Sequence, residues 1–329
     1  MQSPIDISSL LKAALAEDIG SGDITSNATI PQSMQTCFAM NARAEMVVCG
    51  LVFLPELFAM VDAWPMPSPV APKSAPTSPE GRGNANGEAG EPLPSGKVEK
   101  REGRFSGEGM ALTLHVADGD KVQAGTTLAT ISGPARALLS GERVALNLVQ
   151  QLSGVATLTR RYVDAVAGTN AQILDTRKTV LGMRAAQKYA VRCGGGMNHR
   201  MGLYDAVLIK DNHIAVAGGV AQAIMAVKAS VVKGITIEVE CDTLMQLDEA
   251  LATGCDTVLL DNMSNEQLRE AVAKVDAHKR ATGQAVKTEA SGNVSLATVR
   301  GIAETGVDYI SVGKLSHSAV AVDIGLDEA

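Results

Sequence analysis

Residues 173–213 read ILDTRKTVLGMRAAQKYAVRCGGGMNHRMGLYDAVLIKDNH, and this stretch decides the fold. Two short apolar runs, Gln172–Leu174 and Ala206–Ile209, have the length of buried strands, and a helix-like segment lies between them. Four similar runs follow at Ile235–Val239, Thr257–Leu260, Val286–Ala290 and Tyr309–Val312. Strands that alternate with helices form a parallel sheet, so this α/β pattern predicts an open or incomplete β/α barrel.

The same stretch is basic within an acidic chain. Residues 173–213 hold seven Lys or Arg against three Asp, whereas the whole chain has a formal net charge of -7. A concave basic surface attracts small anions, so the stretch indicates an anion site. Three of its basic residues share one helical face and are expected to include solvated charges: Arg184, Lys188 and Arg192. Three others directly follow the apolar runs and fit an anion site better: Arg177, Lys178 and Lys210.

The composition excludes several classes of protein. The 329 residues are 46% hydrophobic but only 3% aromatic, which is typical of α/β proteins with small-residue helices. The five cysteines show no C-x-x-C spacing, so we expect free thiols and a cytoplasmic location. No apolar run has transmembrane length, no signal peptide is evident, and the sequence pI of about 5.3 argues against general nucleic-acid binding. No G-x-G-x-x-G motif supports a dinucleotide site.

The residues before the barrel pattern predict an N-terminal domain. Helical spacing covers Ile5–Asp18 and Leu51–Ala63, and strands are expected at Phe38–Val48, Leu112–Val116 and Thr127–Ile131. Trp64–Arg104 holds eight of the twelve prolines, which predicts a disordered insertion or a long surface loop. Pro134–Val166 is the longest helical pattern, with a break expected near Ser153-Gly154.

These patterns give a division of the chain. We predict an N-terminal domain over residues 1–135, which also receives the end of the chain. The barrel is expected over residues 136–310, followed at 311–329 by the end of the last strand and a C-terminal helix.

Polar residues or glycines follow every predicted strand, and active sites of β/α barrels lie at the carboxyl ends of the strands. These residues are Asp175-Thr176-Arg177-Lys178, Lys210-Asp211-Asn212-His213, Glu238 and Glu240, Asp261-Asn262, Glu289 with Ser291-Gly292-Asn293, and Gly313-Lys314. Early strands offer cations, middle strands carboxylates, and late strands glycine-rich turns that suit a phosphate. The pattern indicates a phosphorylated sugar that meets an anionic partner.

Several of these residues have a second interpretation. His199 alone is more often a hydrogen-bonded structural residue, and His317 fits a phosphate contact or a helix cap equally well. Glu238 and Glu240 point to the same face, so one of them can be structural. On the sequence alone, Arg143 beside Glu142 is best interpreted as half of a surface ion pair.

At these residues the chain resembles the quinolinate phosphoribosyltransferase family. The matching stretches are ERVALNLVQQLSGVATLT, DTRKT, KYAVRCGGGMNHRMGLYDAVLIKDNHI, IEVE, LLDNMS, EASGNVS and ETGVDYISVG, with EDIGSGDITS near the N-terminus. DTRKT, CGGGxNHR and LIKDNH in this order are highly specific. Two departures are the Trp64–Arg104 insertion and Val180-Leu181, where the family usually has Thr-Pro.

The resemblance implies roles for individual residues. Around the quinolinate carboxylates it places Arg177, His199, Arg200 and Lys210. Lys178 would face the pyrophosphate of phosphoribosyl pyrophosphate, while Glu240 and Asp261 would hold the ribose hydroxyls and Mg²⁺. The 5′-phosphate would be bound by Ser291, Gly292, Gly313 and His317. Lys178, Lys210, Glu240 and Asp261 form the implied catalytic set.

The resemblance also implies an N-terminal α/β sandwich packed on an open barrel, and a homodimer in which Arg143 reaches the neighbouring subunit's site. The implied reaction converts quinolinate and phosphoribosyl pyrophosphate into nicotinate mononucleotide, pyrophosphate and CO₂. Two alternatives are a ModD-type protein of molybdenum operons and a homologue that binds anions without turnover. The intact NHR motif with Arg143 argues against the first alternative. The pair Glu240 and Asp261 argues against the second, because anion binding has no use for carboxylates.

Overall fold

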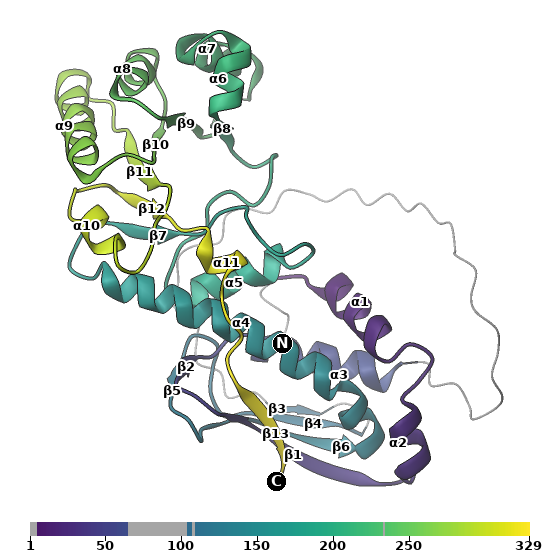
Figure 1. The fold of residues 1–329 in the computed structure, drawn as a ribbon. Coiled ribbons are helices and arrows are strands. Elements are labelled where there is room, and N and C mark those ends of the chain that lie inside the picture. The colour runs from purple at the N-terminus through teal and green to yellow at the C-terminus, as the bar shows by residue number, and fades with distance from the viewer. Residues whose placement is uncertain (1–4, 65–103, 107–108, 233) are drawn as a thin grey trace.

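The computed structural model describes residues 5–64, 104–106, 109–232 and 234–329. The prediction for Trp64–Arg104 therefore lies almost wholly outside the described residues. Within them, the chain forms an antiparallel sheet with helices at one end of the molecule and a parallel sheet with helices at the other (Figure 1). The fold is thus mixed α/β, as predicted.

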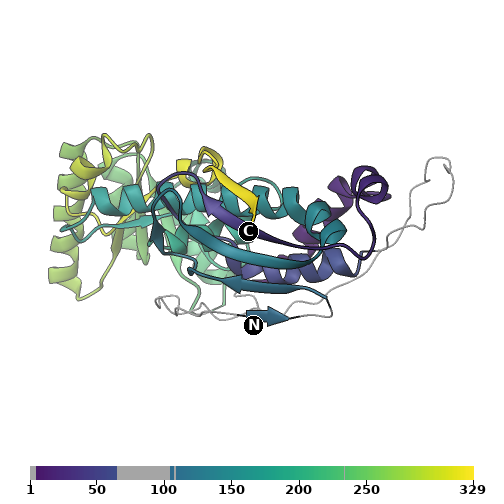
Figure 2. The ribbon, with the colours of Figure 1, turned by 90° about the horizontal axis from the view of Figure 1, so that it is seen from below.

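The antiparallel sheet has five strands in the order β13-β1-β6-β4-β3. Their bounds are β1 Gln35–Ala42, β3 Arg104–Ser106, β4 Ala111–Leu114, β6 Thr127–Pro134 and β13 Ile324–Glu328. Helices gather on one side of this sheet (Figure 2), including α1 Ser8–Asp18 and α3 Leu54–Asp62. Smaller elements are α2 Ile24–Thr29, η1 Leu51–Phe53, and the pair β2 Met46–Val47 and β5 Lys121–Val122. Apolar residues of α1, α3 and the inner sheet face are buried together, which gives the sandwich a continuous core.

The C-terminal helix predicted within residues 311–329 covers only four residues. After the four-residue helix α11 Lys314–His317, the chain returns to the first sheet as strand β13. β13 pairs antiparallel with β1, with Ala42 opposite Ile324. The side chain of Ile324 is buried in the core, and Leu326 packs against it. Burial of these two alternating residues, together with the ladder to β1, holds the segment as a strand.

The break expected near Ser153-Gly154 was wrong, because α4 runs without interruption from Ala135 to Ala165. A Cβ atom on Gly154 would lie 2.2 Å from the carbonyl oxygen of Val320. The glycine therefore permits close contact with the returning chain and does not end the helix. α4 packs against the antiparallel sheet and against β7 and α5 of the other half, so it joins the two. The predicted domain boundary at 135 stays a prediction.

The parallel sheet contains all six predicted strands, in the order β7-β12-β11-β10-β9-β8. They are β7 Gln172–Leu174, β8 Val207–Ile209, β9 Ile237–Cys241, β10 Thr257–Asp261, β11 Lys287–Ser291 and β12 Tyr309–Ser311. The helices of this half are α5 Arg184–Cys193, α6 Asp211–Ala217, α7 Val220–Ser230, α8 Leu244–Thr253, α9 Asn265–Thr282 and α10 Val299–Ala303. This is the strand order of a β/α barrel, with no pairing of β7 to β8 among the described residues. The barrel is open there, as predicted.

The edge of β7 that faces the opening has another partner. Leu174 forms an isolated parallel bridge with Met197, whose backbone N–H donates to the carbonyl of Ile173 at 2.8 Å. The segment after α5 thus lies along β7.

Among the described helices no single one is long and apolar enough to cross a membrane, although α6 and α7 together, bent by 90°, reach that length and composition. All five cysteines are free.

Candidate active site

The loop after β7 carries the first predicted cations. The hydroxyl of Ser316 donates to the carbonyl of Lys178 at 2.8 Å. Gln187 accepts from the backbone N–H of Val180 at 2.9 Å and donates to the carbonyl of Ser316 at 2.9 Å. The loop is therefore fixed by a buried glutamine, without the proline that the family usually has at position 181. Arg177 on this loop has a buried Nε atom with no hydrogen-bond partner.

A second cation comes from residues 194–200, which we call the cation loop. Its last residue, Arg200, donates from Nη1 to the carbonyl of Ala206 at 3.0 Å, and its Nε is buried without a partner. Burial and the nearby charge of Arg177 lower the pKa of Arg200. Two guanidinium groups thus lie near each other, each with an unsatisfied buried donor. This arrangement suits a ligand with two carboxylates.

His199 has protein partners at both ring nitrogens. Its Nε2 lies 2.9 Å from Oε2 of Glu238, and its Nδ1 accepts the backbone N–H of Arg200 at 2.8 Å. Burial alone would lower the pKa of His199, but the hydrogen bond and charge of Glu238, with the charge of Glu289, raise it overall. Glu238 is therefore the structural member of the glutamate pair. In this arrangement His199 is held between Glu238 and the backbone of Arg200, and its contact with quinolinate stays a prediction.

Glu289 adds a second buried carboxyl beneath His199. Burial, and next the charge of Glu238, raise the pKa of Glu289 to about 8, so this carboxyl is protonated at neutral pH. The protonated group can donate to Glu238, whose Oε1 otherwise has no partner. Ser311 holds the other oxygen of Glu289 through a short hydrogen bond. Glu238 and Glu289 together therefore carry about one negative charge, which His199 faces.

Three carboxylates, which we call the carboxylate edge, lie at the ends of β9 and β10. Oxygen atoms of Glu240, Asp242 and Asp261 all lie within 4.8 Å of one another. Such a set of hard oxygen ligands fits Mg²⁺, and Asp242 was not predicted as part of it. Nζ of Lys210 lies 3.0 Å from Oε2 of Glu240, so the lysine contacts this edge directly.

The turns after β10 and β11 are strained and close together. Asn262 and Asn293 have left-handed φ angles of 53° and 51°. Asn293 donates to the carboxamide oxygen of Asn262 at 3.2 Å, and Asn262 donates to Asp261 at 2.5 Å. A Cβ atom on Gly292 would lie 2.1 Å from that same oxygen, so only glycine fits. The asparagines therefore link the Ser291-Gly292 turn to Asp261.

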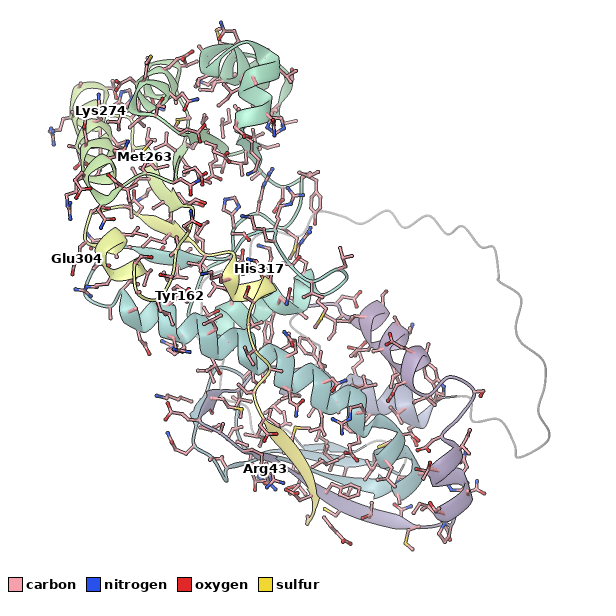
Figure 3. The ribbon with its side chains drawn as sticks, in the orientation of Figure 1. Arg43, Tyr162, Met263, Lys274, Glu304 and His317 are labelled. Atoms are coloured by element: carbon pink, nitrogen blue, oxygen red, sulfur yellow. The ribbon has the colours of Figure 1, made fainter. Side chains whose placement is uncertain are left out.

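Three predicted residues meet at the end of β12. A Cβ atom on Gly313 would lie 3.3 Å from both Nε2 of His317 and Cδ of Lys178. His317 lies on α11 (Figure 3), and its Nδ1 is 2.6 Å from the hydroxyl of Ser318. Its Nε2 has no protein partner among the described residues and is free for a ligand. This fits a phosphate contact better than a helix cap.

Comparisons with known proteins agree with this geometry. Residues 98–153 and 155–327 match the family models of the quinolinate phosphoribosyl transferase N-terminal and C-terminal domains. The chain belongs to the quinolinate phosphoribosyltransferase family. The matched models favour this family over the ModD-type alternative.

Named relatives in this family cover nearly the whole chain. A probable nicotinate-nucleotide pyrophosphorylase [carboxylating] of Bacillus subtilis is 36% identical over 98% of this chain and 93% of its own length. The corresponding protein of Mycobacterium leprae is 48% identical over 68% of this chain and 77% of its own length. A crystal structure of nicotinate-nucleotide pyrophosphorylase from Ehrlichia chaffeensis is 36% identical, with a TM-score of 0.80 over 99% of this chain and all of that one.

The structure also shows the surroundings of Arg143 and Lys188. The side chain of Arg143 on α4 is 59% exposed and 4.0 Å from Glu142, so within one chain it is the surface ion pair that the sequence favoured. Lys188, expected on a solvated face, is fully buried and paired with Asp175, which corrects that prediction. Helical spacing defines one face of a helix but not what surrounds that face. It could therefore not show that Lys188 is buried or what Arg143 contacts beyond its own chain.

Proposed function

We propose that the protein transfers the phosphoribosyl group of phosphoribosyl pyrophosphate to quinolinate, with loss of CO₂, as the names of its relatives indicate. The observations that carry the proposal are the unsatisfied guanidinium pair, Arg177 and Arg200, and the carboxylate edge that Lys210 contacts through Glu240. A dianionic acceptor and a cationic sugar centre need these opposite charges side by side. Bidentate guanidinium contacts can orient both carboxylates of quinolinate at once.

The carboxylate edge serves the sugar. As the anomeric C–O bond breaks, positive charge develops on the ribose, and Glu240 and Asp261 are placed to stabilise it. Glu240, Asp242 and Asp261 would hold Mg²⁺, which when bound neutralises charge on the pyrophosphate. Lys178 assists the leaving pyrophosphate.

The 5′-phosphate fits the late strand ends. Ser291 and Gly292 form one turn there, and Gly313 and His317 form the other. A phosphate between them would accept hydrogen bonds from backbone N–H groups and from Nε2 of His317.

The remaining chemistry follows from the acceptor. The pyridine nitrogen bonds to the anomeric carbon as pyrophosphate departs with the electrons of the C–O bond. The ring becomes cationic, so C2 can hold the electron pair of the C–C bond when the 2-carboxylate leaves as CO₂, and a proton from solvent then takes the place of the carboxyl group at C2. The products are nicotinate mononucleotide, pyrophosphate and CO₂. Arg177 and Arg200 hold the acceptor in line throughout.

One assay tests this function. The protein, phosphoribosyl pyrophosphate and Mg²⁺ are incubated with quinolinate or with nicotinate, and nicotinate mononucleotide and CO₂ are measured. We expect turnover with quinolinate only, because nicotinate has one carboxylate for two guanidinium groups. No product from quinolinate would contradict the function, and equal use of nicotinate would contradict the two-carboxylate clamp.

We further propose a homodimer in which Arg143 completes the partner's site. Its exposed side chain on α4 is free to reach across an interface. Arg143→Ala and Lys210→Ala should each abolish most activity. Mixing the two under subunit exchange should restore it, since some heterodimers carry one site with both residues intact. No recovery after confirmed exchange would mean that Arg143 acts within its own chain.

The cytoplasmic location stays a prediction from the free cysteines. Relatives from tobacco are named as mitochondrial, so the family itself is not confined to one compartment.

A further inference from the structure

A buried ion pair lies behind the cation loop. Asp175, the first residue of DTRKT, and Lys188 on α5 each have 1% of the side chain exposed, and a short hydrogen bond joins them. Burial is the largest influence on both groups: it raises the pKa of Asp175 and lowers the pKa of Lys188, and each charge opposes the other's shift. Neither charge could be kept there without the other.

The pair holds the backbone of His199 from both sides. The carboxylate of Asp175 accepts the N–H of His199 at 2.9 Å, and Nζ of Lys188 donates to the carbonyl of His199 at 2.8 Å. The peptide groups on either side of this residue are thus fixed by two opposite charges. Arg200 follows directly, so its direction depends on the same two bonds.

Asn198 completes the network. Its amide nitrogen donates to Asp175 at 2.6 Å and to the carbonyl of Lys188 at 2.8 Å. Its oxygen accepts from Arg192 at 2.5 Å. Behind it, Met197 and β7 exchange backbone hydrogen bonds. All polar atoms of the Asn198 side chain are used, which explains an amide at this position.

We infer that Asp175, Lys188 and Asn198 are positioning residues for quinolinate, which act by fixing His199 and Arg200 of the cation loop. The inference rests on the proposed function for the substrate that Arg200 binds. A buried ion pair adds little stability compared with a well-packed apolar pair, so stability alone does not account for it. Its two charges instead define where the loop backbone must lie.

The experiment compares single and double variants. Lys188→Met and Asp175→Asn each leave one buried charge, whereas Asp175→Leu/Lys188→Met replaces the pair with apolar groups of similar shape. We expect the singles to lose thermal stability and the double variant to regain most of it. The KM for quinolinate should stay raised by about tenfold or more in all three, and the KM for phosphoribosyl pyrophosphate should change little.

Leu268→Ala is the matched control, because it destabilises a buried position of α9 away from the site. It should lower the melting temperature without raising the KM for quinolinate relative to the KM for phosphoribosyl pyrophosphate. A double variant with the wild-type KM for quinolinate, or equal changes in both KM values, would overturn the inference. If a single variant fails to fold, the double variant still decides.

A second measurement separates this inference from the proposed function. Hydrogen–deuterium exchange of residues 196–200 reports the cation loop without any substrate. We expect faster exchange there in the double variant than in the wild type. Unchanged protection in the double variant would overturn the positioning role even in an active enzyme. If exchange is faster in the double variant but the wild type makes no product from quinolinate, only the proposed function is contradicted.

Discussion

The cation loop and the carboxylate edge border one site, but the protein holds them in opposite ways. The cation loop is fixed by buried side chains, and the guanidinium group of its Arg200 retains an unsatisfied donor. The carboxylate edge has few protein contacts beyond Lys210 and Asn262, and Asp242 is exposed. Under the proposed function, this difference predicts an acceptor site that is built in advance and a carboxylate edge that a bound cation would complete.

The largest effect should come from the carboxylate edge. Asp261→Asn removes a charge that stabilises the transition state, so kcat should fall by roughly 100-fold or more with small changes in KM. Steady-state kinetics with both substrates checks this. Asp248→Asn, which breaks an exposed pair with Lys274, is the control and should be active. A change confined to KM would place Asp261 in ground-state binding.

On the opposite side, Arg200→Ala should act mainly on binding. It removes a charge-assisted contact to the acceptor, so the KM for quinolinate should rise by roughly 10- to 100-fold. The exposed Arg269→Ala is a matched control with no expected effect. If Arg200→Ala and Asp261→Asn gave the same kinetic pattern, the division between the two sides would be wrong.

The buried carboxyl group of Glu289 should make the stability of the fold depend on pH. Glu289 has a pKa of about 8 in the fold, against an ordinary value of 4.5. Below pH 4.5 it is protonated in both states. As pH rises toward 8 only the unfolded form ionises, so the wild type should lose stability relative to Glu289→Gln, on the order of a few kcal/mol. Denaturant unfolding at several pH values measures this, with exposed Glu270→Gln as control. A constant difference would show that Glu289 is ionised in the fold.

The smallest effect should come from the exposed pair on α4. Glu142→Gln removes the partner of Arg143 at 4.0 Å, and such surface pairs contribute about 0.5 kcal/mol or less. Thermal unfolding should barely change. A large loss of thermal stability would mean that this exposed pair matters for folding as much as the buried pair Asp175–Lys188.

Sequence reasoning reached the parallel sheet because each strand carries its own apolar run. It predicted most of the candidate site residues for a related reason, since the carboxyl ends of parallel strands share one edge of a sheet. The prediction that Lys188 lies on a solvated face failed, because the spacing of residues on α5 does not show that Lys188 faces Asp175. Sequence reasoning also missed Asp242, which follows β9 by one residue.

Other failures have a common cause in distant partners. Gly154 suggested a helix break, yet the residue it contacts, Val320, is far along the chain. A C-terminal helix was expected within residues 311–329, but residues 324–328 form a strand, whose conformation depends on pairing with β1. The role of Arg143 depends on a second chain and comes from the family resemblance alone.

The pairing of β13 with β1 has a consequence for the order of synthesis. A ribosome releases β1 early, but the strand that covers its edge emerges only after the whole parallel sheet has been synthesised. Until then β1 presents unpaired backbone groups, which invite pairing with another nascent chain. The antiparallel sheet therefore cannot finish folding as a first, independent step. We expect β1 to be a site where chaperones protect the growing polypeptide.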